Sequence, residues 1–256
     1  MRRLRLYARL TRLLLVLAAG AALAASVSLL EKVGRTQKLA LRQRLSRRFM
    51  GWLSAALPFR VRLSGEKPQQ PMLWVANHVS WTDIPLLGQL LPLSFLSKAE
   101  VRNWPLAGWL AERAGTLFIR RGAGDGLLLN RQIAERLQDG CPLLVFPEGT
   151  STTGESVRAF HGRLLGGAIE AGVALQPVAV RYRRNGELDP LAPFVGDDEL
   201  TEHLLRLLEA DVGEVHIQLL PPIETRDGER SALARQARAA IETALNGTDE
   251  QIEQAA

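Results

Sequence analysis

A histidine and a carboxylate stand five residues apart in the segment 76–83, directly after the apolar run 72–75. A strand that ends here and turns into a helix would leave the imidazole of His78 at the edge of a sheet, where active sites of α/β folds lie. If Asp83 holds one ring nitrogen, His78 becomes a competent general base. A polar turn that caps the next helix explains the same residue types, so this segment alone leaves both interpretations open.

A second polar turn follows the apolar stretch 142–146 and carries Glu148. A carboxylate at the end of an apolar strand needs a partner or a task. Gly149 allows close backbone approach, and Thr150 and Ser151 offer hydroxyl groups. Two turns of this kind could converge at one edge of a sheet.

Cationic residues end two further apolar runs. Arg120 and Arg121 follow the run 115–119, and their planar guanidinium groups suit a phosphate or a carboxylate. Lys98 ends the run 93–97 and could join them. Taken singly, Lys98 and Arg120 are explained more simply as solvated ends of strands.

The order and spacing of these segments resemble the motifs of the glycerolipid acyltransferases of the lysophosphatidic acid acyltransferase type. Their first motif, Asn-His, four residues and Asp, is present as residues 77–83. Their second motif, Gly-x-x-Phe-Ile-x-Arg, matches 115–121, and their third, Phe-Pro-Glu-Gly-Thr, matches 146–150. Their fourth, an apolar stretch around Pro-Val, matches 176–180. Four matches in the family's order make a chance resemblance improbable.

The resemblance implies transfer of an acyl group from acyl-CoA or acyl-carrier protein to the hydroxyl of a lysolipid, with no cofactor. It also implies that His78 is the base and that Asp83 is its partner. The residues that it implies for the acceptor site are Arg121, Glu148, Gly149 and Thr150. Secondary candidates for the site are Asn77, Lys98, Arg120 and Ser151.

Two departures from the family pattern bear on the acceptor. Ser151 stands where the third motif commonly continues with arginine, and His161 stands where the family often has lysine. The turn that follows Thr150 is similar to that of the lyso-ornithine lipid acyltransferases, whose acceptor carries its own amine. Such an acceptor would gain less from those cations and could use Glu148 or Glu155. The acceptor is therefore either lysophosphatidic acid or a lyso-aminolipid.

Other functions fit the residues less well. A serine hydrolase would need a nucleophile elbow such as Gly-x-Ser-x-Gly, which the sequence lacks. A metal site is not expected, because His78 and Asp83 are only two ligands and His-Glu-x-x-His is absent. A non-catalytic membrane adaptor or lipid-binding protein with a decayed site is the alternative to an enzyme.

The elements that must position these residues alternate along the chain after residue 71. Short apolar runs alternate with helical stretches, which predicts an α/β fold with a mixed, largely parallel sheet flanked by helices. The predicted strands are 71–76, 93–97, 115–120, 142–147, 174–182 and 214–220. The predicted helices are 84–91, 105–114, 126–139, 161–172, 197–209 and 230–246.

Composition excludes several classes of protein. The chain has 256 residues, of which 46% are hydrophobic and 23% charged, as in an ordinary folded protein. Because Cys141 is the single cysteine, no intramolecular disulfide can form, and we expect it to be buried and structural. Nucleic acid is not an expected partner, because no DNA- or RNA-binding motif is present. The glycines of 122–126 lack the lysine and the spacing of a P-loop.

Positive charge is concentrated in the N-terminal quarter. Residues 1–67 hold 15 of the 32 Lys and Arg residues but only two acids. Within this quarter, residues 13–30 are uncharged and mostly apolar, and as a helix they would span about 27 Å. A membrane anchor, a cleaved signal peptide and a helix in one leaflet compete as interpretations. We favour an uncleaved anchor, because basic residues also follow the apolar tract.

The stretch 37–60 predicts a basic amphipathic helix in the membrane interface, with Phe49 and Trp52 dipping inward and arginines near anionic headgroups. A core helix of the globular part is the alternative. We therefore expect a protein of a bacterial inner membrane with its catalytic domain on the cytoplasmic side. The predicted parts are a basic N-terminus and anchor helix (1–35), an interfacial helix and linker (36–66), an acyltransferase domain (67–225), and a C-terminal helix and tail (226–256).

Overall fold

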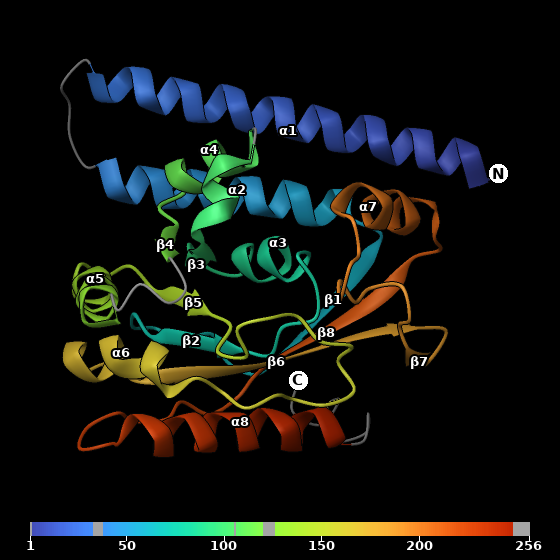
Figure 1. Ribbon diagram of the computed structural model, residues 1–256. Helices are drawn as coiled ribbons and strands as arrows, with labels where there is room; N and C mark the ends of the chain where they lie inside the picture. The colour runs from blue at the N-terminus through green and yellow to red at the C-terminus, as the bar shows by residue number, and fades with distance from the viewer. Residues whose placement is uncertain (1, 33–37, 105, 120–125, 248–256) are drawn as a thin grey trace.

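An eight-stranded sheet forms the centre of the computed structural model, which describes residues 2–32, 38–104, 106–119 and 126–247 (Figure 1). The strands follow the order β1-β8-β6-β2-β5-β3-β4 across the sheet, and β7 pairs with β6. Their bounds are β1 (Phe59–Ser64), β2 (Leu73–Ala76), β3 (Ser94–Lys98), β4 (Leu117–Ile119), β5 (Leu143–Val145), β6 (Leu175–Arg184), β7 (Glu187–Leu188) and β8 (Gly213–Leu219).

The sheet is largely parallel, as predicted. β2 lies at its middle and pairs in parallel with both β5 and β6. The pairs β3–β5, β3–β4 and β1–β8 are also parallel, whereas β6 pairs antiparallel with β8 and β7. A parallel central strand is covered on both faces, which explains why all four residues of β2 are fully buried.

Helices cover both faces of the sheet (Figure 1). Along β2, Trp74 and Ala76 pack into a core shared with Leu86 of α3, whereas Leu73 and Val75 pack into a core shared with Ile133 of α5. The alternation follows from the period of two in a strand. The helices after β2 are α3 (Asp83–Gly88), α4 (Ala107–Arg113), α5 (Gly126–Gln138), α6 (Gly166–Ala171), α7 (Leu200–Glu209) and α8 (Arg230–Asn246), with short 3₁₀ turns η1 (Ala99–Asn103) and η2 (Gly162–Leu165).

The strand β1 is a correction to the prediction, which placed its residues in a helix and a linker. Residues 59–64 pair in parallel with β8, from Phe59 opposite Gly213 to Ser64 opposite Gln218. Pro58 ends the preceding helix, and Phe59, Val61 and Leu63 then alternate with polar residues, the pattern of a half-buried strand. The sheet therefore begins ahead of the predicted start of the domain at residue 67.

Two helices precede the sheet and lie side by side along one side of the molecule (Figure 1). They are α1 (Arg2–Lys32) and α2 (Lys38–Ala56), and they run antiparallel. The packing is close at Gly20, where an added Cβ would lie 2.2 Å from the Phe49 ring. Phe49 is therefore buried against α1 and does not dip into a membrane as predicted, whereas Trp52 is 39% exposed.

The N-terminal arginines hold the end of α7. Arg9 donates to the carbonyl oxygens of Leu208 and Ala210 at 2.9 and 2.6 Å. Arg5 donates to the carbonyl oxygen of Glu209 at 2.7 Å and forms an ion pair with Asp211. The last carbonyl groups of a helix have no partner within it and carry partial negative charge, so the guanidinium groups complete the C-terminus of α7.

By length and composition, residues 2–29 of α1 could cross a membrane. The same helix packs on the rest of the molecule through Leu13, which lies in a small apolar cluster with Ala56 of α2 and Leu208 of α7. Its outward face exposes Leu14, Leu15 and Leu29. The helix is thus docked on the folded domain along one face and apolar on the other.

Candidate active site

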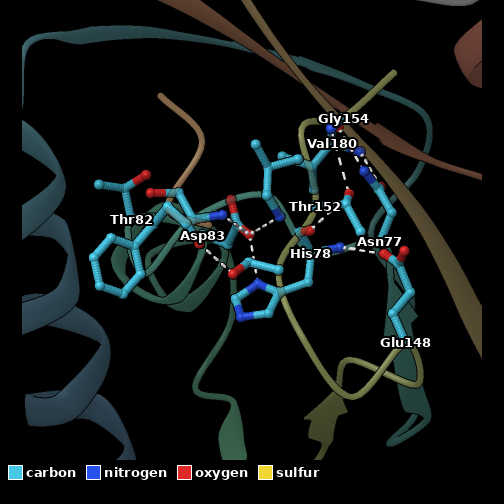
Figure 2. Close-up of polar contacts among 12 residues, drawn as sticks. Asn77, His78, Thr82, Asp83, Glu148, Thr152, Gly154 and Val180 are labelled. Carbon is cyan, nitrogen blue, oxygen red and sulfur yellow. Dashed lines mark hydrogen bonds and ion pairs between the residues drawn. The ribbon is translucent and has the colours of Figure 1, made fainter. Parts of the chain in front are cut away.

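The segment between β2 and α3 places His78 and Asp83 together. β2 ends at Ala76 and α3 begins at Asp83, so the six residues from Asn77 to Thr82 form the connection. Figure 2 shows the His78 ring turned toward Asp83. The Nδ1 atom of His78 lies 2.8 Å from Oδ2 of Asp83, and the His78 side chain is 20% exposed.

The contact fixes the tautomer of His78. An ionised carboxylate only accepts hydrogen bonds, so Nδ1 of His78 carries the proton and donates a hydrogen bond to Asp83. The other ring nitrogen, Nε2, then keeps its lone pair and can accept a proton. The ring of Phe146 stacks on the imidazole with centroids 3.9 Å apart and an interplanar angle of 16°. His78 is therefore held by a hydrogen bond at its edge and by an aromatic ring at its face.

Asp83 is fully buried and is satisfied by hydrogen bonds from three sides. Its Oδ2 also accepts the backbone N–H groups of Val79 and Ser80 at 2.9 and 3.0 Å. Its Oδ1 accepts the hydroxyl of Tyr182 at 2.5 Å. Hydrogen bonds to the ionised form offset the cost of burying this carboxylate.

The capping interpretation of this segment fails for Thr82. Thr82 occupies the N-cap position of α3 without a side-chain hydrogen bond to the helix. Its hydroxyl contacts the Tyr182 hydroxyl at 2.8 Å instead. Tyr182 itself was not among the predicted site residues, because it lies on β6, 99 residues from Asp83. Its place two residues after the Pro-Val motif stretch 176–180 was the available signal.

Glu148 joins the two polar turns. Its Oε1 accepts the backbone N–H of His78 at 2.7 Å (Figure 2). Its Oε2 accepts the backbone N–H of Arg158 at 2.9 Å. Burial raises the pKa of Glu148, while the two backbone N–H groups oppose that shift. The buried carboxylate of Glu148 thus has hydrogen-bond partners within the protein. Its contact with a substrate stays a prediction.

Asn77 ties the connection to the neighbouring strand. Its side-chain amide donates to the carbonyl oxygen of Val180 at 2.9 Å and accepts the Val180 N–H at 2.8 Å. The side chain is 1% exposed, so it acts like one more rung of the sheet beyond the end of β2. Asn77 therefore fixes the backbone that carries His78.

The turn that follows Glu148 returns to the same connection. Gly149 has a φ of +72°, a conformation that favours glycine. Ser151 donates its hydroxyl to the carbonyl oxygen of Phe194, and Phe194 N–H bonds the Val79 carbonyl at 2.9 Å. Thr150 is half-buried in this turn. The structure thus brings Gly149, Thr150 and Ser151 into the turn that runs beside His78.

The predicted cations lie apart from this cluster or outside the described residues. Lys98 is exposed at the end of β3, which is separated from β2 by β5 in the sheet. Arg120 and Arg121 lie outside the described residues, so their predicted roles stay predictions. Within the described ranges, no three His, Cys, Asp or Glu side chains gather in a way that could hold a metal ion.

Comparison with known proteins shows the family of the chain. The family model described as Acyltransferase matches residues 59–181, a range that starts at the first residue of β1. The chain is 63% identical to the lyso-ornithine lipid O-acyltransferase of Pseudomonas aeruginosa, over 97% of this chain and 96% of that protein. It is 34% identical to the enzyme of the same name from Brucella abortus, over 93% and 97% of the two chains.

Two further likenesses are to proteins named for another acceptor. The 1-acyl-sn-glycerol-3-phosphate acyltransferase of Neisseria gonorrhoeae is 37% identical over 50% of this chain and 51% of its own. The crystal structure of the 1-acyl-sn-glycerophosphate acyltransferase PlsC from Thermotoga maritima superposes with a TM-score of 0.68 at 21% identity, covering 99% and 98% of the two chains. At that identity the superposition shows a shared fold.

Proposed function

Since the chain belongs to the acyltransferase family, we propose that it transfers a fatty acyl group from a thioester donor to the free hydroxyl of lyso-ornithine lipid. The observation that carries this proposal is the 63% identity to the Pseudomonas aeruginosa enzyme over nearly the whole of both chains. Lysophosphatidic acid is the second candidate acceptor, supported by the 37% identity of half of the chain to the Neisseria gonorrhoeae enzyme.

In the proposed reaction His78 is the general base. Its Nε2 takes the proton from the acceptor hydroxyl while the hydroxyl oxygen attacks the thioester carbonyl carbon. The C–O bond forms, and the tetrahedral intermediate then breaks its C–S bond. The proton on Nε2 passes to the departing sulfur, so that the products are an ester and a free thiol. The same steps serve acyl-CoA and acyl-carrier protein, because both present the acyl group as a thioester.

Asp83 supports this step by holding the imidazole. The hydrogen bond from Nδ1 keeps Nε2 as the acceptor, and the buried negative charge stabilises the imidazolium that forms when the proton arrives. Because Asp83 is anchored by backbone N–H groups and by Tyr182, it needs no rearrangement during the reaction.

The residues around the turn suit an acceptor that carries its own amine. Ser151 bonds a backbone carbonyl, and His161 stands where the related motifs often have lysine, so the arginine and the lysine of those motifs are absent here. Glu148 is 4% exposed and each of its oxygens already accepts a backbone N–H group. Glu155, which is exposed, is therefore the better candidate of the two acids for a contact with the amine.

The N-terminal helices attach the enzyme to the membrane in this proposal. Because Arg5 and Arg9 bind the end of α7, α1 lies along the domain with its apolar outward face exposed. This arrangement favours a helix in the plane of one leaflet over a helix that crosses the bilayer away from the domain. It also favours an uncleaved segment, since cleavage would expose the end of α7. We place the catalytic domain on the cytoplasmic side of a bacterial inner membrane.

The function is tested with purified protein in detergent, supplied with lyso-ornithine lipid or lysophosphatidic acid. Each acceptor is paired with acyl-CoA and with acyl-carrier protein as donor. We expect product from lyso-ornithine lipid with at least one donor, and a His78→Ala variant that folds normally but loses nearly all of this activity. Product from lysophosphatidic acid alone would replace the acceptor in the proposal. Absence of product from both acceptors would overturn it.

A further inference from the structure

We infer that Tyr182 is a positioning residue for the reaction, because it completes a chain of hydrogen bonds that orients the carboxylate of Asp83 beneath His78. The inference rests on the proposed role of His78 as the base. It adds to the His78–Asp83 pair a residue on β6, beyond the range 59–181 that the family model matches.

The hydrogen bonds of Tyr182 are short, and the residues that form them are buried. The Tyr182 hydroxyl lies 2.5 Å from Oδ1 of Asp83 and 2.8 Å from the Thr82 hydroxyl. Tyr182 is 1% exposed, and both Thr82 and Asp83 are fully buried. The three residues are therefore closed off from bulk solvent.

The direction of each hydrogen bond follows from the donors available. The Asp83 carboxylate only accepts, so the Tyr182 hydroxyl must donate to it. Because the Tyr182 hydroxyl uses its proton in this way, its oxygen accepts a hydrogen bond from the Thr82 hydroxyl. Burial and the neighbouring charge of Asp83 raise the pKa of Tyr182 well above its ordinary value, so the phenol keeps its proton. The chain therefore runs from Thr82 through Tyr182 to Asp83 and on to His78.

The ring of Tyr182 is fixed by packing. Phe59 of β1 meets it edge-on, with ring centroids 5.1 Å apart and an interplanar angle of 69°. The strand β6 that carries Tyr182 is paired through Val215 of β8 at the same level. The hydroxyl thus approaches Asp83 from a rigid sheet, whereas His78 and Asp83 lie on the connection and on the first turn of a helix.

As a consequence, the two oxygens of Asp83 accept hydrogen bonds from different partners. Oδ2 serves His78 and the backbone N–H groups of Val79 and Ser80, and Oδ1 serves Tyr182. Without the phenol, Oδ1 would be a buried acceptor with no partner among the described residues. The carboxylate would then hold more negative charge toward His78 and be less restrained about its own axis.

The Tyr182→Phe variant tests the inference, because it removes the hydroxyl and keeps the ring. We expect kcat to fall roughly 10- to 100-fold, the size expected for loss of one hydrogen bond to a charged group, with KM changed less than about twofold. The acid limb of the rate profile should move to higher pH, since the more negative Asp83 would keep the imidazolium protonated longer. Thr82→Val should give a smaller shift in the same direction.

The controls separate a positioning role from a structural one. Tyr7→Phe makes the same chemical change at the other tyrosine of the chain, which is 61% exposed on α1, and should leave rate and pH profile unchanged. Thermal unfolding reports the folded fraction of each variant. If Tyr182→Phe loses rate only in proportion to its folded fraction, with an unshifted pH profile, the inference is wrong. If His78→Ala keeps its activity, the proposed function has failed instead.

Discussion

At the scale of single residues, the carboxylate of Asp83 is the point on which the site depends. Its two oxygens accept hydrogen bonds from His78, Val79, Ser80 and Tyr182. All of these partners are donors, so the group that they surround must be an acceptor at every position. A neutral amide of the same shape cannot meet that requirement, because its nitrogen would face a donor.

The Asp83→Asn variant should therefore lose activity without losing its fold. We expect kcat to fall by about 10²- to 10⁴-fold, because the amide would favour the wrong tautomer of His78 and remove the charge that stabilises the imidazolium. Initial rates in detergent, together with circular dichroism, measure the effect. Asp139→Asn, at an exposed aspartate after α5, is the matched control. Equal rates for the two variants would contradict the role of Asp83.

The contact between His78 and Asp83 could be predicted because both residues lie in one short segment. A spacing of five residues across a strand-to-helix turn brings the two side chains together whatever the rest of the sheet does. The tasks of Glu148 and Tyr182 could not be predicted in this way. They contact the segment from 70 and 99 residues away, and the partner of Glu148 there is a backbone N–H group, which a sequence pattern does not reveal.

At the scale of elements, the connection between β2 and α3 is joined to α7 through a hydrogen bond between Trp81 and His203. Trp81 donates its indole N–H to Nδ1 of His203 at 3.0 Å, and Nε2 of His203 donates to the carbonyl oxygen of Pro193 at 3.0 Å. This pattern requires the neutral imidazole, since a protonated ring could not accept from Trp81. The segment that carries His78 is therefore attached to α7 by a histidine that must stay uncharged.

Acidification should weaken the contact between Trp81 and His203. Burial lowers the pKa of His203, Arg206 lowers it further, and Asp198 acts in the opposite direction. The unfolded chain then binds a proton below about pH 6.5 that the folded chain resists, so the free energy of unfolding should fall as the pH drops through that value. The slope contributed by His203 can reach about 1.4 kcal/mol per pH unit.

Urea unfolding of wild type and His203→Gln between about pH 5 and 7.5 measures this contribution. We expect the variant to be less stable at pH 7.5 and to lose less stability on acidification than wild type. His161→Gln, at an exposed histidine, should keep the wild-type dependence. Parallel curves for wild type and His203→Gln would show that the proton is taken up elsewhere.

The elements themselves were largely predictable, with one informative exception. All six predicted strands are present, and so are the helices after residue 71, although residues 162–165 of the predicted helix 161–172 form the 3₁₀ turn η2 and α6 begins only at Gly166. β1 was missed because apolar residues from Leu41 to Ala56 recur at a helical spacing, and the predicted helix was extended past them to residue 60. The alternation of three apolar residues over six positions was weaker than the apparent helical period before it, and the pairing with β8 is formed with residues more than 150 positions away.

At the scale of the whole molecule, the two N-terminal helices and α8 lie on opposite sides of the sheet (Figure 1). Both sides carry exposed arginines, and the side of α1 and α2 also exposes large apolar residues, including Leu14, Leu15 and Trp52. Arg5 and Arg9 bind the end of α7, so we expect other arginines to meet the lipid headgroups proposed as partners. Arg44 and Arg48 of α2 are exposed beside Trp52 and suit that task.

Binding to anionic vesicles should therefore depend on where a charge lies and not only on how many there are. Each arginine near a membrane surface contributes about 1 kcal/mol, so the double variant Arg44→Gln/Arg48→Gln should bind phosphatidylglycerol-containing vesicles roughly 20- to 30-fold more weakly at low salt. The control Arg226→Gln/Arg235→Gln removes the same charge at exposed residues near or on α8 and should bind as wild type does. Sedimentation with vesicles measures both, and added salt should narrow the difference because it screens the headgroup charge. Equal weakening by the two doubles would mean that net charge alone governs attachment, and α2 would then have no place at the membrane surface.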